Sequence, residues 1–355
     1  MGQVQRSIGR LLRAGQLFGV VPWNVKLGAG NVLDRGSFVG HVVRVANIFY
    51  SLGIILAVCI ATGFHYYTFI SSDFIAIRTL NISEDVTVNF IVMVSIIGCQ
   101  FLRPFYTKFT TTIVTVGDEL AAGGGTIDFH RIETIVQRAL LGALLYFGAI
   151  LVFDFLNGAA WPFRFLYRTV LYTLPNVINV LALYQYVVAL GFVHTFYRTV
   201  NKRLMVLERN VSAADRRGNR TKVPATITGD VIAYDHHVAL VEALRRTHLK
   251  ISNLTGEVND RFGALLVLTM LSSFVVLSLK LFELYRLMTI VRWSAATCIL
   301  LLYTVLWIGL HVAKVLMVLY PCHVVQRERD RTGPMLYSFH HSFADNFLHN
   351  AVRPC

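Results

Sequence analysis

The hydrophobic pattern is most regular in residues 251–285, which read ISNLTGEVNDRFGALLVLTMLSSFVVLSLKLFELY. This stretch begins with polar residues among which Leu254, Val258 and Phe262 recur every fourth position, the spacing of one helix face. Its next part, residues 263–279, carries no charged side chain. A helix rises about 1.5 Å per residue, so that part nearly spans a hydrocarbon core of about 30 Å. The pattern predicts one continuous helix that leaves water and crosses a bilayer.

Apolar stretches elsewhere in the chain predict five further membrane spans. They cover residues 46–70, 86–102, 135–155, 165–196 and 293–320. The second is close to the shortest length that crosses a bilayer, and Pro175 predicts a kink in the fourth. The longest polar segment, residues 197–262, separates spans four and five, and its middle has the composition of an exposed linker. The chain is therefore predicted to be all-α, a polytopic membrane helical bundle with six spans.

The composition supports a membrane protein. Hydrophobic residues make up 55% and charged residues 15% of the 355 positions, whereas soluble domains carry about 25% charge. The mean hydropathy is +0.56. The net charge is +13, yet neither a basic patch interleaved with aromatics nor a nucleic-acid-binding motif accompanies it. We therefore expect contact with membrane lipid and none with nucleic acid.

The positions of Lys and Arg predict the orientation, because basic loops stay in the cytoplasm. Twenty-five lie on the side of the N-terminus and four on the other side, so both termini are expected in the cytoplasm. The predicted parts are an N-terminal segment 1–45, spans one to four in 46–196, a cytoplasmic loop with a helix in 197–262, spans five and six in 263–320, and a cytoplasmic tail 321–355. Asn81 lies in an N-x-S/T sequon of a predicted outer loop and is a candidate for glycosylation.

Motifs for catalysis or cofactor binding are not apparent in the sequence. The histidine pairs at 236–237 and 340–341 are adjacent, whereas two metal ligands on one helix face lie four residues apart. The chain has no Walker motif, dinucleotide fingerprint or nucleophile elbow. We expect no enzyme activity, no cofactor and no metal.

Polar side chains within the spans are the better functional signal, since such groups usually face a bundle interior or a wet cavity. Lys280 and Glu283 lie one turn apart and are expected to pair. Arg138 and Lys314 lie near inner span ends and are expected to extend to the interface. Span four carries Asn176, Asn179, Tyr184 and Gln185, and the outer half of the bundle collects Tyr66, Tyr67, Asp154, Trp161, Tyr172, Tyr285 and Trp293. This outer group has the composition of a site for a small organic molecule.

Several short motifs, in their order along the chain, resemble those of the insect chemoreceptor superfamily, specifically its gustatory receptors. They are LFGVVPWNV near the N-terminus, VNKRL at 200–204, the helix LTGEVNDRFGALLVLTMLSSFVVLSLKLFELY, and Cys322, Glu328 and Thr332 in the tail. The resemblance covers nearly the whole chain. It is supported by the predicted inside N-terminus, the long loop between spans four and five, and the short outer loops.

The resemblance implies a ligand-gated cation channel of four subunits, homomeric or formed with other gustatory receptor subunits. Each subunit would have seven helices, a site for small tastants in the outer half of the bundle, and a cytoplasmic anchor where subunits pack. In this sequence the anchor would draw on 231–262, 323–325 and 336–352, with Leu254, Val258, Phe262 and Leu336 as contacts. The implied role is taste perception at the plasma membrane of chemosensory neurons.

One part of the family pattern is missing. The last, pore-lining helix of the family carries Thr-Tyr, five mostly apolar residues and Gln-Phe, and the only Gln-Phe pair here is Gln100-Phe101 in span two. We therefore expect a C-terminally truncated form that lacks the last pore helix and does not conduct ions alone. A splice variant and an incomplete gene model both agree with this expectation.

Three other classes of membrane protein are alternatives to a chemoreceptor. A G-protein-coupled receptor needs an outside N-terminus and a seventh span, which the charge count and the tail oppose. A secondary transporter is expected to show repeated halves and buried acidic residues, and Asp154 is the one isolated carboxylate in a predicted span. A purely structural membrane protein stays open on the residue pattern alone. The ligand is also open, since sugars, bitter compounds and carbon dioxide all suit aromatic and polar groups of these kinds.

Overall fold

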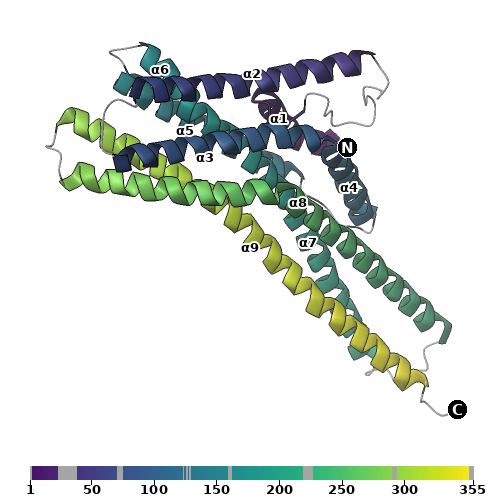
Figure 1. The fold of residues 1–355 in the computed structure, drawn as a ribbon. Helices are drawn as coiled ribbons and strands as arrows, with labels where there is room; N and C mark the ends of the chain where they lie inside the picture. Colours follow the sequence, from purple (N-terminus) through teal and green to yellow (C-terminus); the bar gives the residue numbers. More distant parts are fainter. Residues whose placement is uncertain are drawn as a thin grey trace. The chain divides into compact units, whose positions relative to one another are not determined.

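The computed structural model describes residues 2–22, 38–69, 75–122, 124, 127, 129–158, 162–218, 227–289 and 294–351 (Figure 1). The regular structure in these ranges is helical and includes no strand. Its elements are α1 Gly2–Leu17, α2 Phe38–Phe69, α3 Ile75–Phe101, α4 Arg103–Ala122, α5 Phe129–Gly158, α6 Pro162–Arg168, the π-helical turn η1 Thr169–Thr173, α7 Leu174–Gly218, α8 Ile227–Thr289 and α9 Ala295–Ala351. The prediction of an all-α chain is confirmed.

The long helices agree with the predicted spans. Among the described residues, five helices are long and apolar enough to cross a membrane, in α2, α5, the run from α6 to α7, α8 and α9. The bent pair α3 and α4 counts as a sixth if it is taken as one span. The helix α8 is unbroken for 63 residues, which confirms the prediction of one continuous helix, and its part Ala239–Thr289 is long and apolar enough to cross a membrane. The chain is thus a polytopic helical membrane protein.

The helix α3 departs from the predicted second span at both ends, and both departures involve polar sequence. The helix α3 begins at Ile75, before the apolar stretch, and its first half carries the charged residues Arg78, Glu84 and Asp85. It places Asn81 inside a helix rather than in a loop. At its other end the chain breaks at Leu102, two residues before Pro104, which has no N–H to continue the helix hydrogen bonds of α3.

The kink predicted near Pro175 takes the form of a π-helical turn. In η1 the Leu174 N–H donates to the carbonyl oxygen of Thr169, five residues back. Proline has no N–H to donate, so the turn before Pro175 lacks one ordinary helix hydrogen bond. A π-turn adds one residue to the helix and rotates the side chains beyond it by about 100° relative to those before it.

The chain divides into two compact units. Unit 1 comprises Met1–Thr110, Phe129–Val188 and Asn259–Tyr320, and unit 2 comprises Thr111–Asp128, Ala189–Val258 and Pro321–Cys355. Unit 2 is therefore built from continuations of the long helices rather than from an inserted domain. The segment predicted as an exposed linker is helical to Gly218 and again from Ile227, and residues 219–226 lie outside the described residues.

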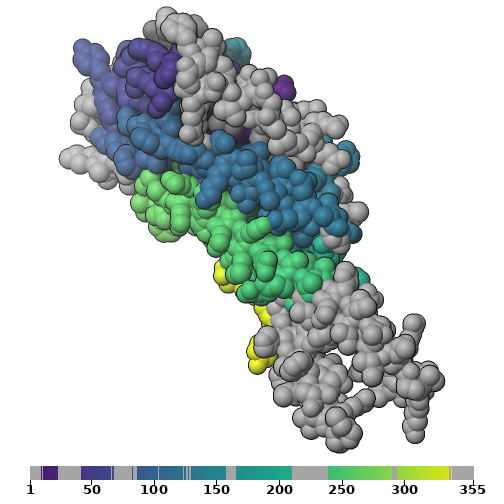
Figure 2. Space-filling model, turned by 90° about the vertical axis from the view of Figure 1, so that its right-hand side faces the viewer, coloured from purple at the N-terminus to yellow at the C-terminus, as the bar shows by residue number. Residues whose placement is uncertain are grey.

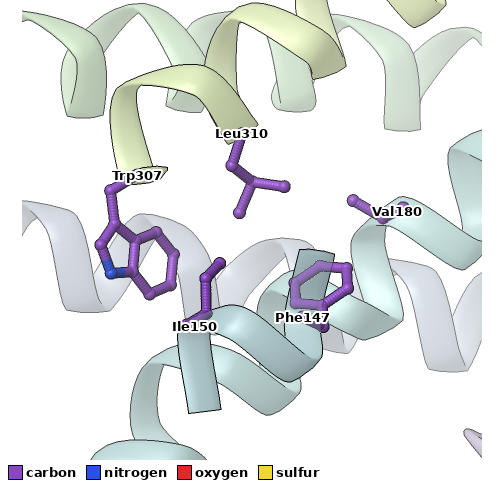
Figure 3. Packing of buried hydrophobic residues seen from close by; sticks show 5 residues of the cluster. All are labelled: Phe147, Ile150, Val180, Trp307 and Leu310. Carbon is purple, nitrogen blue, oxygen red and sulfur yellow. The ribbon is translucent and has the colours of Figure 1, made fainter. Parts of the chain in front are cut away.

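The core of unit 1 lies where α5, α7 and α9 meet. Figure 3 shows its centre, in which Phe147 and Ile150 of α5 pack with Val180 of α7 and with Trp307 and Leu310 of α9. On another side of unit 1, the Phe105 ring of α4 packs on the Phe262 ring of α8 at 5.9 Å, and blue α4 atoms lie beside green α8 atoms in Figure 2.

Large apolar side chains also cover the outside of the long helices. Examples are Phe49 of α2, Leu144 of α5 and Phe274 of α8, each at least two-thirds exposed. Such side chains would be costly in water over a large area, whereas hydrocarbon is their preferred surrounding. The pattern is that of lipid-facing helices around a mixed polar and apolar core.

Candidate functional site

Asp154 lies fully buried in α5 of unit 1, with an exposed fraction of 0%. Its Oδ2 accepts a hydrogen bond from Thr173 Oγ1 at 3.0 Å, and its Oδ1 accepts one from the Tyr303 hydroxyl at 2.7 Å. The carboxylate thus joins three elements, α5, η1 and α9. A carboxyl group at this position in a membrane helix is costly to bury and marks a functional site by default.

The π-turn supplies one side of this contact. Thr173 is the last residue of η1, and Tyr172 beside it packs against the core of unit 1. Without the extra residue of the π-turn, the side chains of η1 would be rotated by about one position relative to those of α7. Single π-turns inside α-helices occur frequently at functional sites.

A second polar contact lies further along the same helices. Lys314 of α9 is only 2% exposed, and its Nζ donates a hydrogen bond to Oδ1 of Asn176 on α7. Asn176 in turn donates from Nδ2 to the carbonyl oxygen of Tyr172 at 2.8 Å. The prediction that Lys314 extends to the interface is wrong, because its face of α9 points into unit 1.

The buried face of α9 carries a series of polar and aromatic side chains. Tyr303, Trp307, His311 and Lys314 follow one another at intervals of four, four and three residues, the spacing of one helix face. The Tyr303 and Trp307 rings lie 6.1 Å apart edge to face, and the Trp307 and His311 rings are stacked at 6.3 Å. His311 is buried, and its Nδ1 has no hydrogen-bond partner among the described residues.

The helix α8 adds hydroxyl groups to the same region of unit 1. Thr269 Oγ1 donates to Oδ1 of Asn179 on α7 at 3.1 Å, and the buried Ser273 hydroxyl finds no partner among the described residues. Nearer the outer end, Lys280 Nζ lies 3.2 Å from Glu283 Oε2, which confirms their predicted pairing. Four elements, α5, η1 with α7, α8 and α9, therefore direct polar groups into an apolar bundle.

The structure brings together only part of the group of outer residues that the sequence singled out. Asp154 and Tyr172 lie at the site just described. Tyr66 instead lies between α2 and α3, where its hydroxyl donates to the Ile82 carbonyl oxygen at 3.5 Å. Tyr67 and Tyr285 are 88% and 63% exposed on the outside of their helices. Trp161 and Trp293 lie outside the described residues.

The sequence reasoning did not select Tyr303, Trp307, His311 and Thr173 for the site. For Tyr303, Trp307 and His311 the signal is present in α9 as aromatic and polar residues at helical spacing within an apolar stretch, whereas Thr173 lies in η1 and does not belong to this series. That spacing shows that the three α9 residues share a face, but it does not show which neighbouring helices cover that face.

The predicted anchor residues are buried within the chain itself. Leu254 and Val258 are buried in unit 2, while Phe262 in unit 1 packs on the rings of Phe105 and Tyr186. Leu336 belongs to α9, and its side chain lies outside the described part. Leu254, Val258 and Phe262 are thus buried by contacts within their own chain, and their role in contacts between subunits stays a prediction.

Two motifs that are far apart in the sequence meet in unit 2. Asn201 of the VNKRL motif donates from Nδ2 to the Glu328 carbonyl oxygen at 2.9 Å and to Glu328 Oε2 at 3.0 Å. The Thr332 hydroxyl donates to Asn201 Oδ1 at 2.7 Å. Two residues further along the motif, the Arg203 guanidinium donates to the Leu120 carbonyl oxygen of α4. The motif therefore ties α7 to α9 and to α4 within this unit.

Comparison with known proteins agrees with this architecture. A comparison with curated proteins finds no match. The family model described as 7tm Chemosensory receptor matches residues 8–352, which is nearly the whole chain and includes the VNKRL motif, the long helix α8 and the tail residues Glu328 and Thr332. The chain therefore belongs to the 7tm chemosensory receptor family.

Proposed function

We propose that this chain is a gustatory receptor, a subunit of a ligand-gated cation channel that detects small tastants at the plasma membrane of chemosensory neurons. The family match supports a chemoreceptor, and the motifs of the sequence resemble the gustatory branch. The proposal includes assembly into a tetramer, homomeric or with other gustatory receptor subunits. A receptor of this kind recognises its ligand without transforming it, so no catalytic group is assigned.

The single observation that best supports ligand recognition is the buried carboxylate of Asp154 with its two hydroxyl partners. Hydroxyls on η1 and α9 that donate to one carboxylate can exchange these bonds for bonds to a ligand hydroxyl or amine. Aromatic faces at Tyr172 and Trp307 offer contact area to the ligand's apolar part. A compound that bonds Asp154 therefore competes with the contacts that join α5 to α9.

Such competition gives a physical route from binding to gating. A ligand shifts an equilibrium only by the difference of its affinities for the two states. A compound that replaces the Tyr303 bond to Asp154 favours a state in which α9 is no longer held to α5 at this point. Tyr303 is the residue of α9 through which this difference acts.

The test uses the purified full chain in neutral detergent with a panel of sugars, bitter alkaloids and bicarbonate. A ligand that binds only the folded state raises its stability by about 2.7 kcal/mol at a hundred times its Kd, so it raises the midpoint of thermal unfolding. We expect a member of the panel to do so, and expect its half-saturating concentration to rise in Asp154→Asn and in Tyr303→Phe.

The matched control is Tyr320→Phe, which removes a hydroxyl from an exposed tyrosine of the same helix. Its half-saturating concentration should equal that of the unaltered chain. Equal ligand response in all three variants places recognition elsewhere. A panel without effect on the unaltered chain contradicts tastant recognition. Cation current on co-expression with a gustatory receptor relative then tests the channel part of the proposal.

A further inference from the structure

The N-terminal helix α1 has two different faces. Leu11 and Leu12 are buried, and the helix packs against α5 in unit 1. Arg13 is exposed, and Leu17, one turn further along the same face, is 65% exposed. The helix therefore combines an inner leucine face with an outer face that carries arginine and an apolar side chain.

Hydrogen bonds fix the end of α1 to one end of the bundle in unit 1. The Tyr50 hydroxyl donates to the Leu17 carbonyl oxygen, Cys99 Sγ donates to that of Gly19 at 3.0 Å, and Gln185 Nε2 donates to that of Val20 at 3.2 Å. The first two donors lie in the first half of α2 and near the end of α3. Figure 1 shows α1 beside this end, where α2 begins and α3 ends. The end of α1 is thus held near the start of α2 and the end of α3.

Other helices add exposed arginines beside exposed apolar residues at this end. Arg44 lies at the start of α2, with exposed Val42 and Val45 on either side of it. Arg138 is exposed in the first third of α5, three residues after exposed Ile135. A guanidinium beside apolar side chains suits the headgroup region of a membrane, where the apolar part reaches acyl chains and the cation reaches phosphate.

We propose that the outer face of α1, together with Arg44, binds the phosphate groups of anionic phospholipids. The exposed leucine and valines favour a lipid over a soluble acidic partner, because acyl chains cover them while phosphate meets the arginines. Guanidinium groups pair with phosphate through two parallel N–H donors. Under the predicted orientation this end faces the cytoplasm, and the cytoplasmic leaflet is the one that carries anionic lipid.

The test measures lipid binding to the purified full chain in neutral detergent micelles. The probe is phosphatidylserine with a fluorescent acyl chain, followed by anisotropy, and phosphatidylcholine with the same label is the neutral reference. One basic residue near an anionic surface contributes about fivefold in affinity, so Arg13→Gln with Arg44→Gln should weaken phosphatidylserine binding by about 25-fold. Phosphatidylcholine binding should change by less than twofold.

A matched control keeps the total charge of the two variants equal. Arg209→Gln with Arg327→Gln removes two exposed arginines of unit 2 and should leave phosphatidylserine binding within twofold of the unaltered chain. Arg13→Lys with Arg44→Lys keeps both charges and should retain most of the affinity. This charge-retaining pair separates a loss of binding from a loss of folding.

Several outcomes would overturn the proposal. Equal affinity for the two labelled lipids removes the role of the anionic headgroup. An equal loss in the control pair shows a general effect of net charge. Displacement of the labelled lipid by inorganic phosphate as readily as by unlabelled phosphatidylserine indicates a site for free phosphate. More effective displacement by poly-glutamate indicates that an acidic protein segment, and not lipid, occupies this surface.

Discussion

Replacing Tyr303 with phenylalanine removes one donor from the buried carboxylate of Asp154 and leaves the ring in place. The bond that is lost measures 2.7 Å, and Asp154 keeps its second bond to Thr173 at 3.0 Å. A hydrogen bond to a charged group contributes about 1.5 to 3 kcal/mol, because its loss leaves a buried acceptor without water or a partner. We therefore expect Tyr303→Phe to lower the free energy of unfolding by about 1.5 to 3 kcal/mol.

The measurement is equilibrium unfolding in mixed micelles of increasing SDS fraction. Tyr320→Phe is the control, since Tyr320 is 69% exposed on the same helix and should change the free energy by less than about 0.5 kcal/mol. Thr173→Val and the double variant complete a cycle, in which the two losses should not add because both donors share one carboxylate. Equal effects of Tyr303→Phe and Tyr320→Phe would refute the reasoning.

Three further predictions concern other parts of the chain. Gly15→Ala should destabilise the fold by about 1 to 3 kcal/mol, because the added Cβ would lie 2.5 Å from Val21 Cγ2. Gly9→Ala is the control, since a Cβ there meets no atom within 4 Å, and thermal unfolding compares the two variants. Asn201→Ala leaves three hydrogen bonds of unit 2 unmade and should cost about 2 to 4 kcal/mol, seen as faster trypsin cleavage than in the exposed control Asn253→Ala. Lys314 should escape a water-soluble amine reagent that modifies exposed Lys202, as mass spectrometry of the folded chain would show, and equal modification would contradict its burial.

The fold was largely predictable from the sequence because hydrocarbon imposes a simple rule on it. A segment that crosses a bilayer must be apolar over about 30 Å and must satisfy its own backbone, so hydropathy locates the helices. The same rule does not locate helix ends. The polar starts of α3 and α8 and the polar end of α7 stay helical well beyond the apolar stretches.

The site was only partly predictable, because the same residue types occur in binding sites and at the membrane interface. Aromatic residues near a span end suit both a binding site and a membrane interface. Tyr172 belongs to the buried core of unit 1, while Tyr67 and Tyr285 have the exposure of interfacial residues. Lys314 shows the converse, since a lysine near a span end usually extends to water, and only the packing of α9 against α7 shows that this one does not.

The helix α9 carries the polar groups of both units on one continuous backbone. Tyr303 and Lys314 hold it within unit 1, and Glu328 and Thr332 hold it to Asn201 within unit 2. Unit 2 begins on this helix at Pro321, which lacks the N–H that would complete the helix hydrogen bond there. Pro334 lies inside the same helix and also lacks its N–H, so bending α9 costs less at either proline than elsewhere along the helix. Under the proposed function, a ligand that replaces the Tyr303 bond to Asp154 therefore acts on the same helix that carries Glu328 and Thr332.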